Sequence, residues 1–175
     1  MKLVHPESGI ALRTIQFTDR DRLVFLANNP KVANNLRDDF PHPYTVEDAE
    51  HFIEHAQAAN PALRFCIEKE GVYVGNIGVH PQEDIYQRSA EIGYFIGEPY
   101  WGQGIATQAV KLIVEYAFQE LDYHRIFAGV FAYNGASRKV LENAGFLFEG
   151  ASIDAIYKNG KFYDELRFAR INPSH

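Results

Sequence analysis

Residues 97–107 read Gly97-Glu98-Pro99-Tyr100-Trp101-Gly102-Gln103-Gly104-Ile105-Ala106-Thr107 and place a glycine-rich turn between two regular elements. Before the turn, residues 90–96 form a short apolar and aromatic run that is typical of a buried strand. After it, apolar residues recur at helical spacing: Ala106, Ala109, Val110, Ile113, Val114, Ala117, Phe118 and Leu121. Unpaired amides at a helix N-terminus attract anions, and glycines let an anion come close. The stretch therefore predicts a site for a phosphorylated cofactor.

Two common phosphate-binding loops do not match this turn. It has no Lys followed by Ser or Thr, which a P-loop requires, and Gly102-x-Gly104 lacks the third spaced glycine of a dinucleotide fingerprint. The run from Trp101 to Ala106 instead resembles the pyrophosphate loop of the GNAT acetyltransferases, in which Gln or Arg is followed by two residues, Gly, any residue, and Gly or Ala. Trp101 replaces the usual Gln or Arg. The resemblance implies that the pyrophosphate of acetyl-CoA is bound by the backbone amides of Gly102, Gln103, Gly104, Ile105, Ala106 and Thr107.

A second stretch supports the same resemblance. The run from Arg125 to Ala132 predicts a strand, and the following Asn134-x-x-Ser137-x-x-Val140-Leu141-x-x-x-Gly145-Phe146 is similar to the second GNAT signature. The ending, from Glu149 to Asp164, looks like the branch of Rim-type ribosomal-protein N-acetyltransferases and polyamine acetyltransferases. The resemblance covers nearly the whole chain. It implies a single domain, 1–175, of the α/β (α+β) class, with a mixed, mostly antiparallel sheet that is splayed at the cofactor strand and flanked by helices.

The activity that the resemblance implies is direct transfer of an acetyl group from acetyl-CoA to a primary amine. Such transfer needs a neutral amine, a positioned thioester and stabilisation of the developing oxyanion. By the match to the family, Tyr94, Phe95 and Ile96 line the pantetheine, and one of their amides polarises the thioester carbonyl. Asn134 would bond the pantetheine amide, and Ser137 would assist the cofactor sulfur. Each has a structural alternative. Tyr94, Phe95 and Ile96 would be core residues, Asn134 a turn residue, and Ser137 the N-cap of a helix over 138–143.

Glu91 is the predicted general base. It lies three residues before Tyr94 on the same apolar strand, where a carboxylate could accept the amine proton directly or through water. The alternative is a Glu that orients a neighbouring loop or binds the substrate ammonium. Some Rim-type relatives carry an acidic residue at the position of Gly129, and many GNAT enzymes carry a proton-donating Tyr at the position of Leu141. Neither of those roles carries over to this chain.

The acceptor site is predicted in the segment from Asn34 to Tyr44, whose many turn residues exclude a regular element. Arg37, Asp38 and His42 are its candidate substrate-binding residues. Acceptor pockets are built from variable loops and helices, so the sequence leaves the acceptor open among a protein N-terminus, a polyamine, an aminoglycoside and an amino acid.

Composition narrows the class of protein further. A chain of 175 residues with 46% apolar content suits one domain with a sizeable core. The net charge of −6 argues against nonspecific nucleic-acid binding and is compatible with a cationic amine substrate. No apolar run approaches ~18 residues, so neither a membrane span nor a secretion signal is predicted, and a cytoplasmic protein is expected. A homodimer is compatible with the sequence, which does not reveal the oligomeric state.

Periodicity and turn residues predict the remaining elements. In chain order these are a strand over 10–15, a helix from Asp19, a loop through 28–30, a helix from Thr45 to about Ala59, and a hairpin of 65–69 with 73–80. Thr45 is the expected N-cap, with Asp48 at the capping-box position. The single cysteine, Cys66, lies in an apolar run and is expected in the core.

Two other functions stay open. His51-Phe52-Ile53-Glu54-His55 matches the inverted zinc-peptidase pattern H-x-x-E-H, and histidines at i and i+4 share a helix face. No third ligand accompanies them in a recognisable context, and the same residues fit an amphipathic surface helix, so no metal site is predicted. The missing family Tyr also allows a CoA-binding regulatory protein that has lost turnover.

Overall fold

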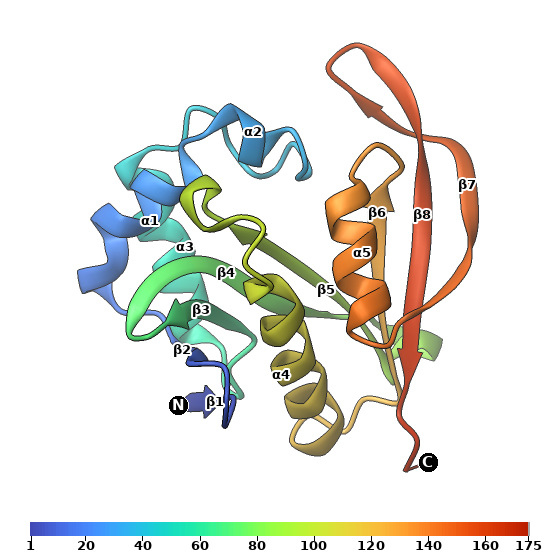
Figure 1. Ribbon diagram of the computed structural model, residues 1–175, viewed down its shortest axis with the longest axis horizontal. Helices are drawn as coiled ribbons and strands as arrows, with labels where there is room; N and C mark the ends of the chain where they lie inside the picture. Colours follow the sequence, from blue (N-terminus) through green and yellow to red (C-terminus); the bar gives the residue numbers. More distant parts are fainter. Residues whose placement is uncertain (175) are drawn as a thin grey trace.

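The computed structural model describes residues 1–174 (Figure 1). Its strands are β1 (Lys2–Val4), β2 (Ile10–Thr14), β3 (Arg64–Lys69), β4 (Val72–Pro81), β5 (Ser89–Ile96), β6 (Arg125–Phe131), β7 (Leu147–Lys158) and β8 (Lys161–Ile171). Its α-helices are α1 (Arg20–Ala27), α2 (Pro30–Ala33), α3 (Val46–Ala58), α4 (Ile105–Gln119) and α5 (Gly135–Asn143). Short 3-10 turns form η1 (Phe17–Asp19), η2 (Asp84–Tyr86) and η3 (Glu98–Tyr100). Within residues 1–174, no helix has the length and apolar character needed to cross a membrane.

The strands form one eight-stranded sheet in the order β1-β2-β3-β4-β5-β6-β8-β7. Every neighbouring pair is antiparallel except β5 and β6, which run parallel. The pairing of β5 with β6 ends at Glu91 and Phe127, although β5 continues to Ile96 and β6 to Phe131. The sheet therefore opens between these two strands. The prediction of a mixed, mostly antiparallel sheet that is splayed at the cofactor strand is confirmed.

The two faces of the sheet carry two apolar clusters. The larger cluster packs under α4 and α5, and the smaller one packs under α1 and α3. In Figure 1, α4 and α5 lie across the front of the sheet, whereas α3 lies behind it. Because successive residues of a strand point to opposite faces, Tyr94 packs against the larger cluster and Phe95 against the smaller one. Cys66 is fully buried in the smaller cluster, as the sequence predicts.

Local signals explain several of the element boundaries. Thr45 begins α3 by accepting a hydrogen bond from the Asp48 amide, while the Asp48 carboxylate accepts one from the Thr45 amide, so the predicted capping box is confirmed. The hairpin of β3 and β4 turns at Glu70 and Gly71, as predicted. The sequence does not predict β1 or α2, because elements of three and four residues are too short to show a periodicity. The helix α2 therefore replaces part of the expected loop, with Asn29 as its N-cap.

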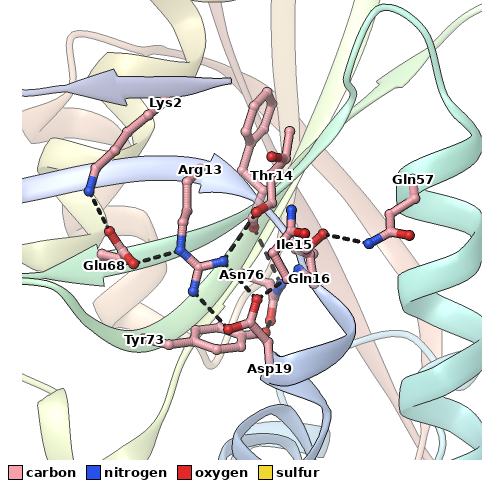
Figure 2. Close-up of polar contacts among 11 residues, drawn as sticks. Lys2, Arg13, Thr14, Ile15, Gln16, Asp19, Gln57, Glu68, Tyr73 and Asn76 are labelled. Carbon is pink, nitrogen blue, oxygen red and sulfur yellow. Dashed lines mark hydrogen bonds and ion pairs between the residues drawn. The ribbon is translucent and has the colours of Figure 1, made fainter.

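A network of charged side chains joins β1, β2 and β3 to η1, just before α1 (Figure 2). Arg13 donates to the two carboxylate oxygens of Asp19 at 2.7 Å each and to Glu68 at 2.6 Å, and Lys2 donates to Glu68 at 2.9 Å. Desolvation acts to raise the pKa of Asp19, but hydrogen bonds from Arg13 and from the Gln16 amide outweigh it and lower that pKa. At Glu68, desolvation is likewise outweighed by Lys2 and Arg13, which lower its pKa. The network favours the folded state while both carboxylates are ionised.

Candidate active site

The glycine turn forms the N-terminus of α4. Gly104 precedes the first helical residue with φ 74°, and Gly102 has φ 73°, a backbone region that favours glycine. A Cβ at either position would meet no atom within 4 Å, so the space in front of the helix is open. The first-turn amides, those of Ile105, Ala106 and Thr107, have no acceptor in the part of the chain that the structure describes. Unpaired amides at the positive end of a helix dipole suit an anion.

The strand β5 presents backbone groups to the opening in the sheet. The amide of Gly97 donates to Val74 of β4 at 2.9 Å. Backbone groups of an antiparallel strand alternate between its two sides, so the amides of Tyr94 and Ile96 point away from β4 and toward the opening. The Phe95 amide faces β4 instead. Of the three predicted cofactor-strand residues, two therefore offer an amide to a ligand that lies in the opening.

Trp101 connects the end of β5 to the glycine turn. Its indole Nε1 donates to the carbonyl oxygen of Ile96 at 2.6 Å. The residue that stands in place of the family's Gln or Arg thus satisfies a carbonyl at the end of the strand. The sequence does not predict this contact, because the family motif does not indicate where the side chain at position 101 points.

Helix α5 contacts β5 across the opening. The Ser137 Oγ lies 2.8 Å from the Tyr94 hydroxyl, and burial raises the pKa of Tyr94 to about 12, so the phenol stays protonated at neutral pH. Asn134 begins the helix, and its side-chain oxygen accepts from the Ser137 amide at 3.1 Å. The structural alternative for Ser137, as the N-cap of a helix over 138–143, is therefore wrong: the helix begins at Gly135, and Asn134 is its N-cap.

The predicted acceptor segment is irregular, as expected, but its three candidate side chains do not share a partner. Arg37 donates to Glu91 at 2.6 Å, and the Glu91 side chain is only 15% exposed. Asp38 accepts from Lys158 of β7 at 2.5 Å. His42 is exposed. The structure thus brings Arg37 and Glu91 together, and Glu91 lies beside a guanidinium rather than in the apolar surroundings that the sequence suggests.

Further hydrogen bonds hold this segment against the C-terminal hairpin of β7 and β8. Lys158 donates to the Leu36 carbonyl at 2.9 Å, and Asn159 donates to the Asn34 side chain at 3.1 Å. Tyr133, which follows β6, donates to the Asn34 carbonyl. The first half of the acceptor segment, residues 34–38, is therefore held both to β5 and to the hairpin.

These features fit a ligand that has phosphates and an extended, amide-bearing arm. The phosphates would meet the unpaired amides of α4, and the arm would meet the free amides of β5. The side-chain oxygen of Gln108, on α4, is buried and lacks a hydrogen-bond partner within residues 1–174. A donor on a bound ligand would satisfy it, since buried polar atoms are almost always paired. Acetyl-CoA carries both a pyrophosphate and pantetheine amides, so the residues present fit it.

Within residues 1–174, the other reactive side chains do not form a second centre. Burial raises the pKa of the Cys66 thiol to about 12 even though Arg13 lies nearby, so this cysteine is not a nucleophile at neutral pH. His51 and His55 lie on the exposed side of α3 with ring centroids 5.5 Å apart. Among the described residues, no group of three or more His, Cys, Asp or Glu side chains could hold a metal ion. The zinc-hydrolase alternative therefore gains no support there.

Comparison with known proteins places this geometry in a family. The acetyltransferase (GNAT) domain family matches residues 10–147. The chain is 30% identical over 167 residues to the protein named "Putative ribosomal N-acetyltransferase YdaF" from Bacillus subtilis (strain 168), covering 94% of this chain and 86% of that one. Spermidine N(1)-acetyltransferase of Escherichia coli (strain K12) is 27% identical, covering 91% and 84%.

A solved structure agrees with these relatives. Mycobacterium smegmatis RimJ in complex with CoA-disulfide superposes with a TM-score of 0.82 at 26% identity, covering 99% of this chain and 87% of that one. The chain therefore belongs to the acetyltransferase (GNAT) family and is an N-acetyltransferase.

Proposed function

We propose that this N-acetyltransferase uses acetyl-CoA and transfers the acetyl group directly to a primary amine, either a protein N-terminus or a small cationic amine. The observation that carries the proposal is the unpaired first turn of α4 beside a strand with free amides at the edge of an open sheet. Relatives named for a ribosomal and a spermidine activity support these acceptor classes, as does the net charge of −6. Such acceptors are met in the cytoplasm, where we place the reaction.

On the donor side, some residues bind acetyl-CoA and others assist the transfer of its acetyl group. Residues 102–107 hold the pyrophosphate, and the side-chain NH₂ of Asn134 bonds a pantetheine amide. The amide of Tyr94 or Ile96 donates to the thioester carbonyl and stabilises the oxyanion. When bound, acetyl-CoA supplies an activated acyl group with a thiolate leaving group. The Ser137 hydroxyl donates to the departing sulfur and is itself hydrogen-bonded to Tyr94, whose phenol provides the proton donor that Leu141 cannot.

On the acceptor side, Glu91 holds the acceptor segment against β5 through its ion pair with Arg37. The sequence leaves Glu91 either as a general base or as a residue that orients a loop or binds the substrate ammonium. The observed ion pair supports the role of orienting a loop, because the Arg37 guanidinium donates to the Glu91 carboxylate and so joins the acceptor segment to β5.

The two roles predict different kinetics for Arg37→Ala and Glu91→Gln. If Glu91 orients the segment, each change raises KM for the amine by roughly tenfold, and the double variant adds little, because either change breaks the same ion pair. CoA affinity stays constant in all three variants. If Glu91→Gln instead lowers kcat by about 10² to 10⁴ while Arg37→Ala does not, Glu91 is the base. Steady-state kinetics with the best amine, and calorimetry with CoA, make the distinction.

The proposed function itself is tested by release of free thiol from acetyl-CoA. The panel contains an N-terminal peptide, a polyamine, an aminoglycoside and an amino acid. We expect at least one amine to accelerate thiol release and to be recovered in acetylated form. Tight CoA binding with no amine-dependent release would contradict the proposal and support the second candidate, a CoA-binding regulatory protein, which the buried Leu141 in place of the family's Tyr favours.

A further inference from the structure

A row of glycines crosses the sheet where β5 and β6 part. Gly78 of β4 pairs with Gly93 of β5. If the parallel register of Glu91 with Phe127 is continued by two residues, Gly129 of β6 lies opposite Gly93. All three glycines belong to the face of the sheet that carries Glu91, since side chains two residues apart share a face. These three positions therefore add no side chain to that face, although His80 of β4 reaches over Gly93, where a Cβ would lie 3.4 Å from its Nε2.

Glu165 fills the bare space over Gly129. A Cβ built on Gly129 would come within 2.5 Å of the Glu165 Oε1 and 2.8 Å of its Cδ, so the carboxyl group lies directly over the glycine. Glu165 belongs to β8 and pairs with Phe131 of β6. Its Oε2 accepts a hydrogen bond from Arg167 at 2.8 Å, whereas Oε1 has no hydrogen-bond partner in the described part of the chain. The glycine thus lets a carboxylate oxygen from the neighbouring strand reach the opening.

Glu91 is less well placed to meet an amine there. It belongs to the last residue pair before β5 and β6 separate, so its side chain lies where the two strands are still paired. The Glu165 Oε1, which comes from β8, lies over Gly129. Gly129 is two residues beyond Phe127, the partner of Glu91, so β5 and β6 have separated there. The residue after Gly93 on the facing strand is Tyr94, whose amide points into the opening. The Glu165 side chain is 19% exposed, so it can contact a substrate there, and its ion pair with Arg167 fixes its position.

We propose that Glu165 binds the ammonium group of the acceptor and accepts its proton, a role that rests on the proposed function. One proton passes from the ammonium to Oε1, and the freed nitrogen lone pair forms the C–N bond with the acetyl carbon. The C–S bond breaks, and its electron pair goes to the sulfur. The nitrogen then gives its second proton to water, while the thiolate takes a proton from the Ser137 hydroxyl, which regains one from solvent through Tyr94. The products are the acetamide and the CoA thiol, and Glu165 returns its proton to solvent.

The test compares Glu165→Gln with Glu142→Gln. Glutamine keeps the shape of the side chain and an oxygen for Arg167 but cannot serve as a base, so kcat is expected to fall by about 10² to 10⁴ with CoA affinity unchanged. Glu142 forms an exposed ion pair with Arg138 on α5, and its variant is expected to keep the wild-type kcat. Near-wild-type kcat in Glu165→Gln overturns the inference.

Gly129→Ala tests the same placement without changing the chemistry of Glu165. The added methyl group must displace the carboxylate, so kcat falls in the wild-type background and changes little further in the Glu165→Gln background. Independent, additive losses overturn the inference. Calorimetry with CoA verifies that each variant is folded, and Gly129→Ala decides alone if Glu165→Gln does not fold. If the wild type turns over and Glu165→Gln is equally active, only the role of Glu165 is overturned. If the wild type shows no amine-dependent turnover, the proposed function is overturned as well.

Discussion

Replacing Gly104 with valine is expected to weaken CoA binding by about 100-fold. Gly104 has φ 74°, which a β-branched residue avoids, so the turn must distort and redirect the amides that follow it. The valine side chain would also occupy the open space through which an anion reaches those amides. Loss of two hydrogen bonds to a charged phosphate costs about 3 kcal/mol, which corresponds to that factor in affinity. Calorimetric titration of CoA measures it.

Gly71→Val is the matched control for this change. Gly71 lies in the hairpin turn of β3 and β4 with φ 80°, and a Cβ there also meets no atom within 4 Å. The backbone strain is therefore similar, but no part of the proposed cofactor site is involved. The two variants should lose comparable stability, and only Gly104→Val should lose CoA affinity. Equal CoA affinity in both would place the pyrophosphate elsewhere.

Replacing Asp19 with asparagine is expected to lower the free energy of unfolding by about 3 kcal/mol at neutral pH. The change leaves Arg13 without the carboxylate that it contacts through two hydrogen bonds (Figure 2). Arg13 and Asp19 have side chains only 22% and 11% exposed, so water replaces the lost partner poorly. Asparagine can still accept the hydrogen bond from the Gln16 amide, which isolates the effect of the charge. Denaturant unfolding measures the difference.

Asp21→Asn is the control, because the Asp21 side chain is 82% exposed in its ion pair with Arg20, and its loss should cost under about 1 kcal/mol. The pH dependence is a second check. Asp19 and Glu68 have lowered pKa values, so their stabilisation is complete above the carboxyl pKa of the unfolded chain, about 4, and is lost as the pH falls through the lower pKa of the folded protein. The gap between wild type and Asp19→Asn should shrink below that pH. A gap that does not depend on pH would exclude the ionic origin.

Features that depend on local sequence are predictable in this protein. The glycine turn, the helix after it and the capping box of Thr45 with Asp48 are each set by residues within one or two turns of one another. Alternation along a strand also implies that the neighbours Tyr94 and Phe95 lie on opposite faces of the sheet, as they do in β5.

Contacts across long sequence separations are not predictable in the same way. Arg37 reaches Glu91 over 54 positions, and the Tyr94 hydroxyl reaches Ser137 over 43. The place of Glu165 over Gly129 depends on the register of β6 with β8, which no periodicity specifies. The sequence shows only that Gly129 cannot carry the acidic group found in some Rim-type relatives. The pairing of β6 with β8 brings the Glu165 carboxylate over Gly129.

The most direct test of the central claim is a single-turnover reaction with limiting acetyl-CoA and the best amine of the panel. Mass spectrometry follows the acceptor and the protein, while a thiol reagent follows released CoA. Direct transfer predicts that acetylated acceptor and free CoA appear together in equal amounts and that the protein itself is never acetylated. CoA that binds without forming acetylated acceptor, or an acetylated protein side chain that forms before the product does, would contradict the account.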